Sequence, residues 1–289
     1  MAAIATEDRV ILVTGGTGQQ GGAVARNLLE RGFRVRALTR NAGSPNARKL
    51  AELGAEVVTG DLEDGASLEH ALEGAHGAFS VQNFYEAGAE GEVRQGCLLA
   101  DSAARVGTRH LVYSSVASAQ RSTGIPHFET KWRIEEHIRK LGLPYTILRP
   151  VFFMENWFTH TGDAIKRGIL PQPLSPDTSL QQIALDDIGH FAATAFQDPS
   201  TWTGREIDIA GDELTLTRTA QALSRALGHE VTYQQVPWER FRQNAGEELT
   251  IMYQWFEKVG YEADIGALRK LHPQLKTFEQ FLREARTRV

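Results

Sequence analysis

The chain has 289 residues, a net charge of −5 and a single cysteine, Cys97. One cysteine excludes a disulfide within the chain, and an acidic balance argues against general binding to nucleic acid, which needs a basic surface. No stretch is apolar for long enough to span a bilayer, and residues 1–8 lack the basic and apolar regions of a secretory signal, so we expect a cytoplasmic protein without membrane or nucleic-acid contacts.

The predicted elements alternate between strands and helices over the first half of the chain. Arg9–Val13 has the apolar pattern of a strand buried on both faces, and Gly22–Arg31 follows it with apolar residues at helical spacing. Further strands are predicted at Arg34–Leu38, Glu56–Thr59, Gly77–Val81, His110–Ser114 and Pro144–Leu148, and further helices at Ala66–Leu72, Glu92–Val106 and Glu129–Leu141. This repeated order predicts an α/β fold with a doubly wound parallel sheet of the Rossmann type.

The pattern changes after Pro150, where prolines become frequent. The predicted elements there are strands at Gln181–Ala184, Arg205–Ile209 and Val231–Gln235, helices at Asp186–Phe196 and Thr217–Leu227, and a mostly helical tail over Trp238–Val289. We therefore expect a Rossmann domain over residues 1–150, which the glycine-rich turn described next makes an NAD(P)-binding domain. Residues 151–289 are expected to form a smaller, mostly helical C-terminal substrate or partner lobe, partly interleaved with the main sheet.

A glycine-rich turn joins the first predicted strand to the first predicted helix. Its spacing is GxxGxxG at Gly15, Gly18 and Gly21. The first glycine permits the tight turn, the second lets a pyrophosphate approach the backbone, and the third lets the helix pack closely on the sheet. The helix N-terminus offers free N–H groups to the phosphates. The predicted dinucleotide site also includes Thr17, Gln19 and Gln20.

The end of the second predicted strand bears on the choice of dinucleotide. NAD sites usually place an acid there for the ribose 2′-hydroxyl, but this chain has Thr39, Arg40 and Asn41. Arg40 can pair with a 2′-phosphate, which favours NADP(H) over NAD(H); a solvated surface arginine is the alternative. After the third strand, Asp61 and Leu62 are assigned to the cofactor, with Asp61 accepting from the adenine amine, unless it caps the next helix.

Several segments form a specific set. They are GGTGQQGG in the glycine turn, TRN at Thr39–Asn41, GDLED at Gly60–Asp64, VQNF at Val81–Phe84, RPVFFMEN at Arg149–Asn156 and the tail at Leu271–Ala285. Together they resemble the NmrA-like family of atypical short-chain dehydrogenase/reductase proteins over nearly the whole chain. The resemblance implies a Rossmann fold with a small C-terminal lobe and bound NADP(H) or NAD(H). It does not imply one function, because some members reduce quinones, dyes or aromatic ethers and others are redox-sensing regulators that bind protein partners.

The positions that carry chemistry in short-chain dehydrogenases are partly changed. Those enzymes use Tyr-x-x-x-Lys with an upstream serine, and the matching residues here are His127, Lys131 and Ser114 or Ser115. Three interpretations stay open. His127 donates the proton, or Lys131 alone holds the cofactor ribose while hydride passes to an electrophile such as a quinone, or the site is catalytically silent.

The remaining candidates follow predicted strand ends, where ligands lie in such sheets. Gln82, Asn83, Val151 and Phe153 are assigned to the cofactor. No Cys or His spacing suggests a metal site. A pocket for a small apolar substrate is predicted from Phe84, Tyr85, His127, Phe153, Asn156 and Trp157, with core packing as the alternative for the aromatic side chains.

Two functions follow from these residues. The favoured one is an NADPH-dependent reductase of an apolar electrophile such as a quinone. The other is a catalytically weak NADP(H) redox sensor that acts through a regulatory protein partner. We expect a monomer or a homodimer in either situation.

Overall fold

The computed structural model describes residues 6–287, apart from the side chains of residues 160, 286 and 287. This range leaves out residues 1–5 of the N-terminal segment, which was expected to lack a secretory signal, and residues 288–289 of the predicted helical tail. The chain forms two compact units. Unit 1 comprises the chain up to Ala119 together with His127–Arg149 and Ile188–Ile207, and unit 2 comprises Gln120–Pro126, Pro150–Asp187 and the chain from Asp208. Residues 188–207, which lie beyond the expected boundary at 150, therefore belong to unit 1.

Unit 1 is built on a seven-stranded sheet of order β10-β6-β5-β4-β1-β2-β3. The pairings from β3 through β1 and β4 to β6 are all parallel, which confirms the predicted Rossmann architecture. Strand β1, in the interior of the sheet, is buried at every residue, as its uninterrupted apolar run predicts. The strands are β1 (Val10–Val13), β2 (Arg34–Thr39), β3 (Glu56–Thr59), β4 (Gly77–Ser80), β5 (His110–Ser114), β6 (Tyr145–Pro150) and β10 (Glu206–Ile209).

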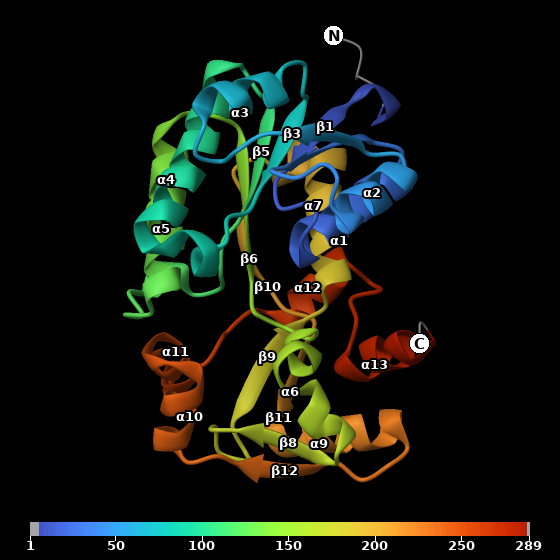
Figure 1. Cartoon of the computed structure of the whole chain (residues 1–289), viewed down its shortest axis with the longest axis vertical. Coiled ribbons are helices and arrows are strands. Elements are labelled where there is room, and N and C mark those ends of the chain that lie inside the picture. The colour runs from blue at the N-terminus through green and yellow to red at the C-terminus, as the bar shows by residue number, and fades with distance from the viewer. Residues whose placement is uncertain (1–5, 288–289) are drawn as a thin grey trace. The chain divides into compact units, whose positions relative to one another are not determined.

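Helices cover both faces of this sheet (Figure 1). On one face lie α1 (Gln19–Glu30), α2 (Pro45–Glu52) and α7 (Leu185–Gln197), and on the other lie α3 (Gly65–Leu72), α4 (Phe84–Arg105) and α5 (Pro126–Lys140). A Cβ at Gly96 of α4 would lie 2.5 Å from Ile134 of α5, so a glycine is needed for these two helices to approach. The shorter elements are η1 (Thr6–Asp8), η2 (Ala119–Arg121) and α8 (Pro199–Trp202).

The register brings the carboxyl ends of the strands to one edge of the sheet. Val13 at the end of β1 lies opposite Ala37 of β2 and Phe79 of β4. The hydroxyl of Thr14 accepts a hydrogen bond from the backbone N–H of Val81 at 2.9 Å, which ties the loop after β1 to the loop after β4. The strand order reverses at these two strands, and ligands of doubly wound sheets bind at such a switch point.

Unit 2 combines two small sheets with a helical C-terminal region. One sheet has the order β11-β9-β7, and the other pairs β8 with β12. The strands are β7 (Phe152–Phe153), β8 (Ile169–Gln172), β9 (Ser179–Ile183), β11 (Asp212–Thr215) and β12 (Thr232–Gln235), and the helices are α6 (Asn156–Lys166), α9 (Leu216–Leu227), α10 (Trp238–Ala245), α11 (Glu247–Lys258), α12 (Ile265–Leu271) and α13 (Phe278–Thr287). Within residues 6–287, no helix combines the length and apolar character that crossing a bilayer requires.

Several elements differ from the predictions, each for a local reason. The helix expected from Glu92 begins at Phe84, because the Asn83 side chain caps it by accepting from the N–H of Tyr85 at 3.1 Å. Gly88 then interrupts the helix with φ of +69°. Helix α2 was not predicted, although Ser44 caps it and a proline follows at its first position. Strands β7, β8 and β11 were also missed, since runs of two to four residues carry little periodicity.

Candidate functional site

The glycine turn after β1 has a backbone that only glycine satisfies at two positions. Gly15 has φ of +62°, and a Cβ on it would lie 2.9 Å from the Val81 side chain. A Cβ on Gly21 would lie 2.4 Å from the carbonyl carbon and oxygen of Gly15, so α1 packs directly against the turn. Asn46, which the sequence analysis did not single out, donates from its side chain to the carbonyl of Thr17 at 2.8 Å and supports the turn from α2.

The first turn of α1 is built to receive an anion. Its N-cap is Gly18, which has no side chain to cap the helix, and no acidic residue lies in the first turn. The early N–H groups and the positive end of the helix dipole are therefore left for a ligand. Gly15, Gly18 and Gln19 are exposed beside this terminus. The backbone thus fits the pyrophosphate of a dinucleotide, as the predicted role of the turn requires.

The residues after β2 carry a positive charge that is already paired. The Arg40 guanidinium donates to the Glu86 carboxylate at 2.8 Å, and Asn83 donates to the other Glu86 oxygen at 3.1 Å. Asn41 accepts from the N–H of Gly43, and its own N–H donates to the hydroxyl of Thr39. Arg40 therefore lies where a 2′-phosphate contact was predicted, in an exposed ion pair with an acid from α4.

Asp61 and Leu62 lie in the loop after β3. Asp61 accepts from the N–H of Glu63 at 3.0 Å, whereas α3 is capped by Asp64, whose side chain accepts from the N–H of Ala66. The alternative role of Asp61 as the cap of α3 is therefore wrong. Its carboxylate is exposed, and Leu62 is partly buried against the core. The predicted adenine contact stays a prediction.

Two buried polar atoms without hydrogen-bond partners lie at the ends of β4 and β5. Gln82 donates to the hydroxyl of Ser80 at 3.0 Å, while its carbonyl oxygen Oε1 has no partner in the described structure. The Ser115 hydroxyl is likewise buried and unsatisfied there. Ser114, predicted as the catalytic serine, instead accepts a hydrogen bond from the Gln20 side chain at 2.7 Å. Buried unsatisfied groups are uncommon, so their presence at this edge suits a polar ligand.

Lys131 is held by a buried acid that the sequence analysis did not identify. Its Nζ donates to Oε1 of Glu92 at 2.9 Å, and the hydroxyl of Thr130 donates to Oε2. The Glu92 side chain has 0% exposure and that of Lys131 has 13%. The pairing spans 39 residues and joins α5 to α4. The ammonium group is thus fixed by one partner, while part of its surface still reaches solvent.

His127 lies one turn before Lys131 among aromatic side chains. Its ring centroid is 5.7 Å from that of Phe84, 6.0 Å from that of Tyr85 and 4.8 Å from that of Phe128. Phe128 is fully buried, whereas Tyr85 is 64% exposed. We call Phe84, Tyr85 and His127 the aromatic group. It places flat apolar surface on unit 1 at the start of α4 and α5, so three of the predicted substrate residues do lie together.

The other predicted residues belong to unit 2. The N–H of Val151 donates to the carbonyl of Ile209 at 3.2 Å, and Phe153 is partly buried in β7. Asn156 begins α6, and Trp157 is buried with its indole N–H donating to Gln182 at 2.9 Å. Glu155, beside them, was not singled out: burial raises the pKa of its carboxyl to about 7, although it accepts hydrogen bonds from the N–H of Leu185.

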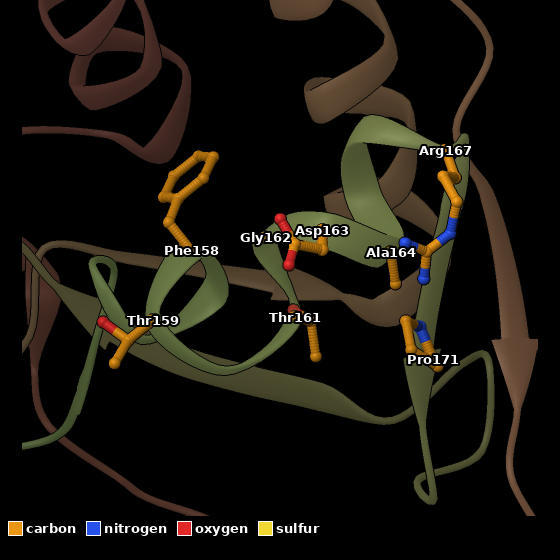
Figure 2. Close-up of a pocket in the computed structure, with 8 residues that line it drawn as sticks. All are labelled: Phe158, Thr159, Thr161, Gly162, Asp163, Ala164, Arg167 and Pro171. Atoms are coloured by element: carbon orange, nitrogen blue, oxygen red, sulfur yellow. The ribbon is translucent and has the colours of Figure 1, made fainter.

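Unit 2 also contains a pocket of about 270 Å³ along α6. Figure 2 shows Phe158 and Arg167 at opposite ends of its lining, with Asp163 between them. The volume is below the usual size of a small-molecule site, and the lining is mostly polar. Across residues 6–287, no group of three or more His, Cys, Asp or Glu residues is arranged to hold a metal ion. The lining residues are Phe158, Thr159, Thr161, Gly162, Asp163, Ala164, Arg167 and Pro171.

Solved structures share the fold of this chain. NmrA, a negative transcriptional regulator in complex with NADP, has a TM-score of 0.81 and 26% identity, covering 96% of this chain and 95% of that one. Its complex with NAD has a TM-score of 0.80 and 25% identity over the same shares. The NADPH-dependent quinone oxidoreductase QOR2 of Escherichia coli, complexed with NADPH, has a TM-score of 0.82, 24% identity and coverage of 95% and 99%, which shows a common fold.

Relatives found by sequence are also NmrA-like proteins. The NmrA-like family domain-containing oxidoreductase lnaB of Aspergillus flavus is 30% identical over 271 residues, which cover 83% of this chain and 80% of that protein. The nitrogen metabolite repression protein nmrA of Emericella nidulans is 30% identical over 249 residues, with coverage of 81% and 70%. The model of the NmrA-like family matches residues 7–282. The chain therefore belongs to the NmrA-like family.

Proposed function

We propose that this protein binds a nicotinamide dinucleotide, with NADP(H) preferred, and reduces a flat, apolar electrophile such as a quinone. The binding half is supported by the uncapped glycine turn at the switch point of the sheet, and by the NADP and NAD complexes of the regulator NmrA. The turn would hold the pyrophosphate and Arg40 the 2′-phosphate. The loops after β3 and β4, with Asp61 and Gln82, would hold the adenosine and the remaining polar groups.

One observation supports the proposed reductase activity: Glu92 fixes Lys131 next to the aromatic group. In short-chain dehydrogenases the corresponding lysine holds the cofactor ribose, and an ammonium with a single partner keeps donors for that purpose. The exposed face of Tyr85 offers a planar acceptor a stacking surface.

The proposed reduction requires a hydride donor and a proton donor. When bound, the reduced nicotinamide supplies a hydride. A quinone that takes up one hydride and one proton becomes a hydroquinone, and the imidazole of His127 can deliver that proton as a general acid. Ser114 accepts from Gln20 and keeps its own O–H as a donor, so it could support the carbonyl oxygen while His127 delivers the proton.

A redox sensor that acts through a protein partner is the second candidate. The favouring observation is that histidine stands where short-chain dehydrogenases carry their proton-donating tyrosine, while the serine hydroxyl accepts from Gln20. The relative named as a nitrogen metabolite repression protein is consistent with such a role. A sensor needs partner affinity that differs between cofactor states, and it needs no turnover.

Consumption of NADPH, followed by its near-ultraviolet absorbance with a panel of quinones, tests the proposal. The variants are Lys131→Met and, as the matched control, Arg133→Met, which removes a cation from the exposed pair with Glu90 between the same two helices. Turnover that is lost in the first variant and kept in the second supports the reductase. NADPH binding without turnover of any acceptor would favour the sensor instead.

A further inference from the structure

An ion pair between Arg40 and Glu86 joins the loop after β2 to the first turn of α4. Arg40 follows β2, and Glu86 comes from the first turn of α4, 46 residues further along the chain. The second oxygen of Glu86 accepts from the Asn83 side chain, so the carboxylate is oriented from both sides. Rossmann proteins that bind NAD hold the ribose 2′-hydroxyl with an acid after the second strand, and residues 39–41 contain none. Glu86 places a carboxylate beside Arg40 from a different element.

We infer that Arg40 and Glu86 together decide between the two dinucleotides. Arg40 binds the 2′-phosphate of NADP(H), while Glu86 competes with that phosphate for Arg40 and accepts a hydrogen bond from the 2′-hydroxyl of NAD(H). Glu86 is thus a specificity-determining residue that restrains the preference for NADP(H). The inference rests on the proposed function, because it assumes that a dinucleotide binds at this edge of unit 1.

The pair is suited to exchange. The side chains of Arg40 and Glu86 are 72% and 60% exposed, so water screens their attraction. Exposed pairs of this kind shift an equilibrium by a factor of roughly 1.4 to 5. A phosphate offers the guanidinium a bidentate partner with greater charge, which is the stronger interaction. NADP(H) can therefore displace the carboxylate at a small cost in affinity, whereas NAD(H) leaves the pair intact.

The backbone lets Glu86 leave Arg40. Residues Phe84–Ala87 form a single turn, and Gly88 separates it from the rest of α4 with φ of +69° and ψ of 175°. Apart from the neighbouring residues and the nearby helix backbone, no heavy atom lies within 4 Å of the position that a Cβ on Gly88 would occupy, so this side of the junction is open. The same turn carries Phe84 and Tyr85 of the aromatic group. Glu86 can accordingly move with its turn and leave the sheet unchanged.

Titration calorimetry of the full chain with NADP⁺ and NAD⁺ tests this inference, with adenosine 2′,5′-bisphosphate and AMP as fragments that lack the nicotinamide. For Glu86→Gln we expect NADP⁺ to bind about threefold more tightly and NAD⁺ about threefold more weakly. The affinity ratio then changes about tenfold. Glu90→Gln is the matched control, because Glu90 lies on the same helix and is also paired with an exposed arginine, Arg133.

These measurements distinguish a failure of the inference about Glu86 from a failure of dinucleotide binding. The inference would be overturned if the ratio of NADP⁺ to NAD⁺ affinity in Glu86→Gln stayed within twofold of the wild-type ratio, or if Glu90→Gln changed it equally. Dinucleotide binding itself would still stand. In the Arg40→Ala background, the gain in NADP⁺ affinity should vanish. If the gain persisted there, Glu86 would act by general repulsion and not through Arg40. A wild-type protein that bound neither dinucleotide would refute the proposed function itself.

Discussion

The buried pair of Lys131 and Glu92 allows a structural and a catalytic role to be separated. Their charged atoms lie 2.9 Å apart, with Glu92 fully buried. Lys131→Met leaves a buried carboxylate without its cation, and the loss of one partner from such a pair costs about 3–5 kcal/mol. Because Thr130 still donates to Glu92 and the site of the lysine is partly exposed, we expect the lower value, about 3 kcal/mol, in the free energy of unfolding.

The double variant Lys131→Met/Glu92→Gln should recover about half of this loss. Both charges are then gone, and the amide oxygen can still accept from Thr130. We expect about 2 kcal/mol of destabilisation for Glu92→Gln alone and about 1.5 kcal/mol for the double variant, so the coupling energy is about 3.5 kcal/mol.

Urea unfolding of the wild type and the three variants, followed by circular dichroism, measures the coupling energy. NADPH turnover of the same four samples then shows what Lys131 does beyond stability. The reductase proposal expects the double variant to be more stable than Lys131→Met but still inactive. Destabilisations that simply add would refute the coupling, and recovered turnover in the double variant would show that Lys131 acts only in the fold.

Three further outcomes are expected. Gly21→Ala should lower the melting temperature and weaken NADPH binding at least tenfold, since its Cβ would meet the Gly15 backbone at 2.4 Å. Gly162→Ala, inside α6 with its nearest neighbour at 4.0 Å, should leave NADPH binding unchanged and not lower the melting temperature. Burial lowers the pKa of His110 from 6.5 to about 4, so below pH 6.5 the unfolded chain takes up a proton that the folded chain does not. Urea unfolding should therefore show that the free energy of unfolding falls by about 2 kcal/mol between pH 7 and pH 5, and His110→Gln should abolish this loss. Equal pH dependence in both proteins would contradict this. Tyr85→Ala should raise the KM for an aromatic quinone several-fold, because the quinone loses a stacking surface. The melting temperature should not change, because Tyr85 is 64% exposed. An unchanged KM would show that Tyr85 does not contact the substrate.

Much of unit 1 could be predicted from local patterns. The apolar run of β1, the glycine spacing and the start of α1 are adjacent in sequence, so a single segment specifies strand, turn and helix. The repeated order of elements then implied parallel strands with their carboxyl ends at one edge. That is why Gly15, Arg40 and Gln82 could be assigned to a common site before their positions were known.

Local patterns were weaker where two residues of the same kind compete or where an element is short. Asp61 and Asp64 are both suitable caps, and only the path of the loop makes Asp64 the cap of α3. In α4, a glycine at position 88 is compatible with a helix start after it, whereas the structure places a further turn before it. The short strands of unit 2 depend on their partners and not on their own composition.

The sequence by itself determined the family, the Rossmann sheet and the edge at which a ligand would bind, because these follow from periodicity and from motifs within short segments. Only the tertiary structure decided which side chains meet there. Glu86 reaches Arg40, Glu92 reaches Lys131 and Gln20 reaches Ser114 across 46, 39 and 94 residues. Such pairs are set by strand order and helix packing, which bring distant residues together without leaving a local signal in the sequence.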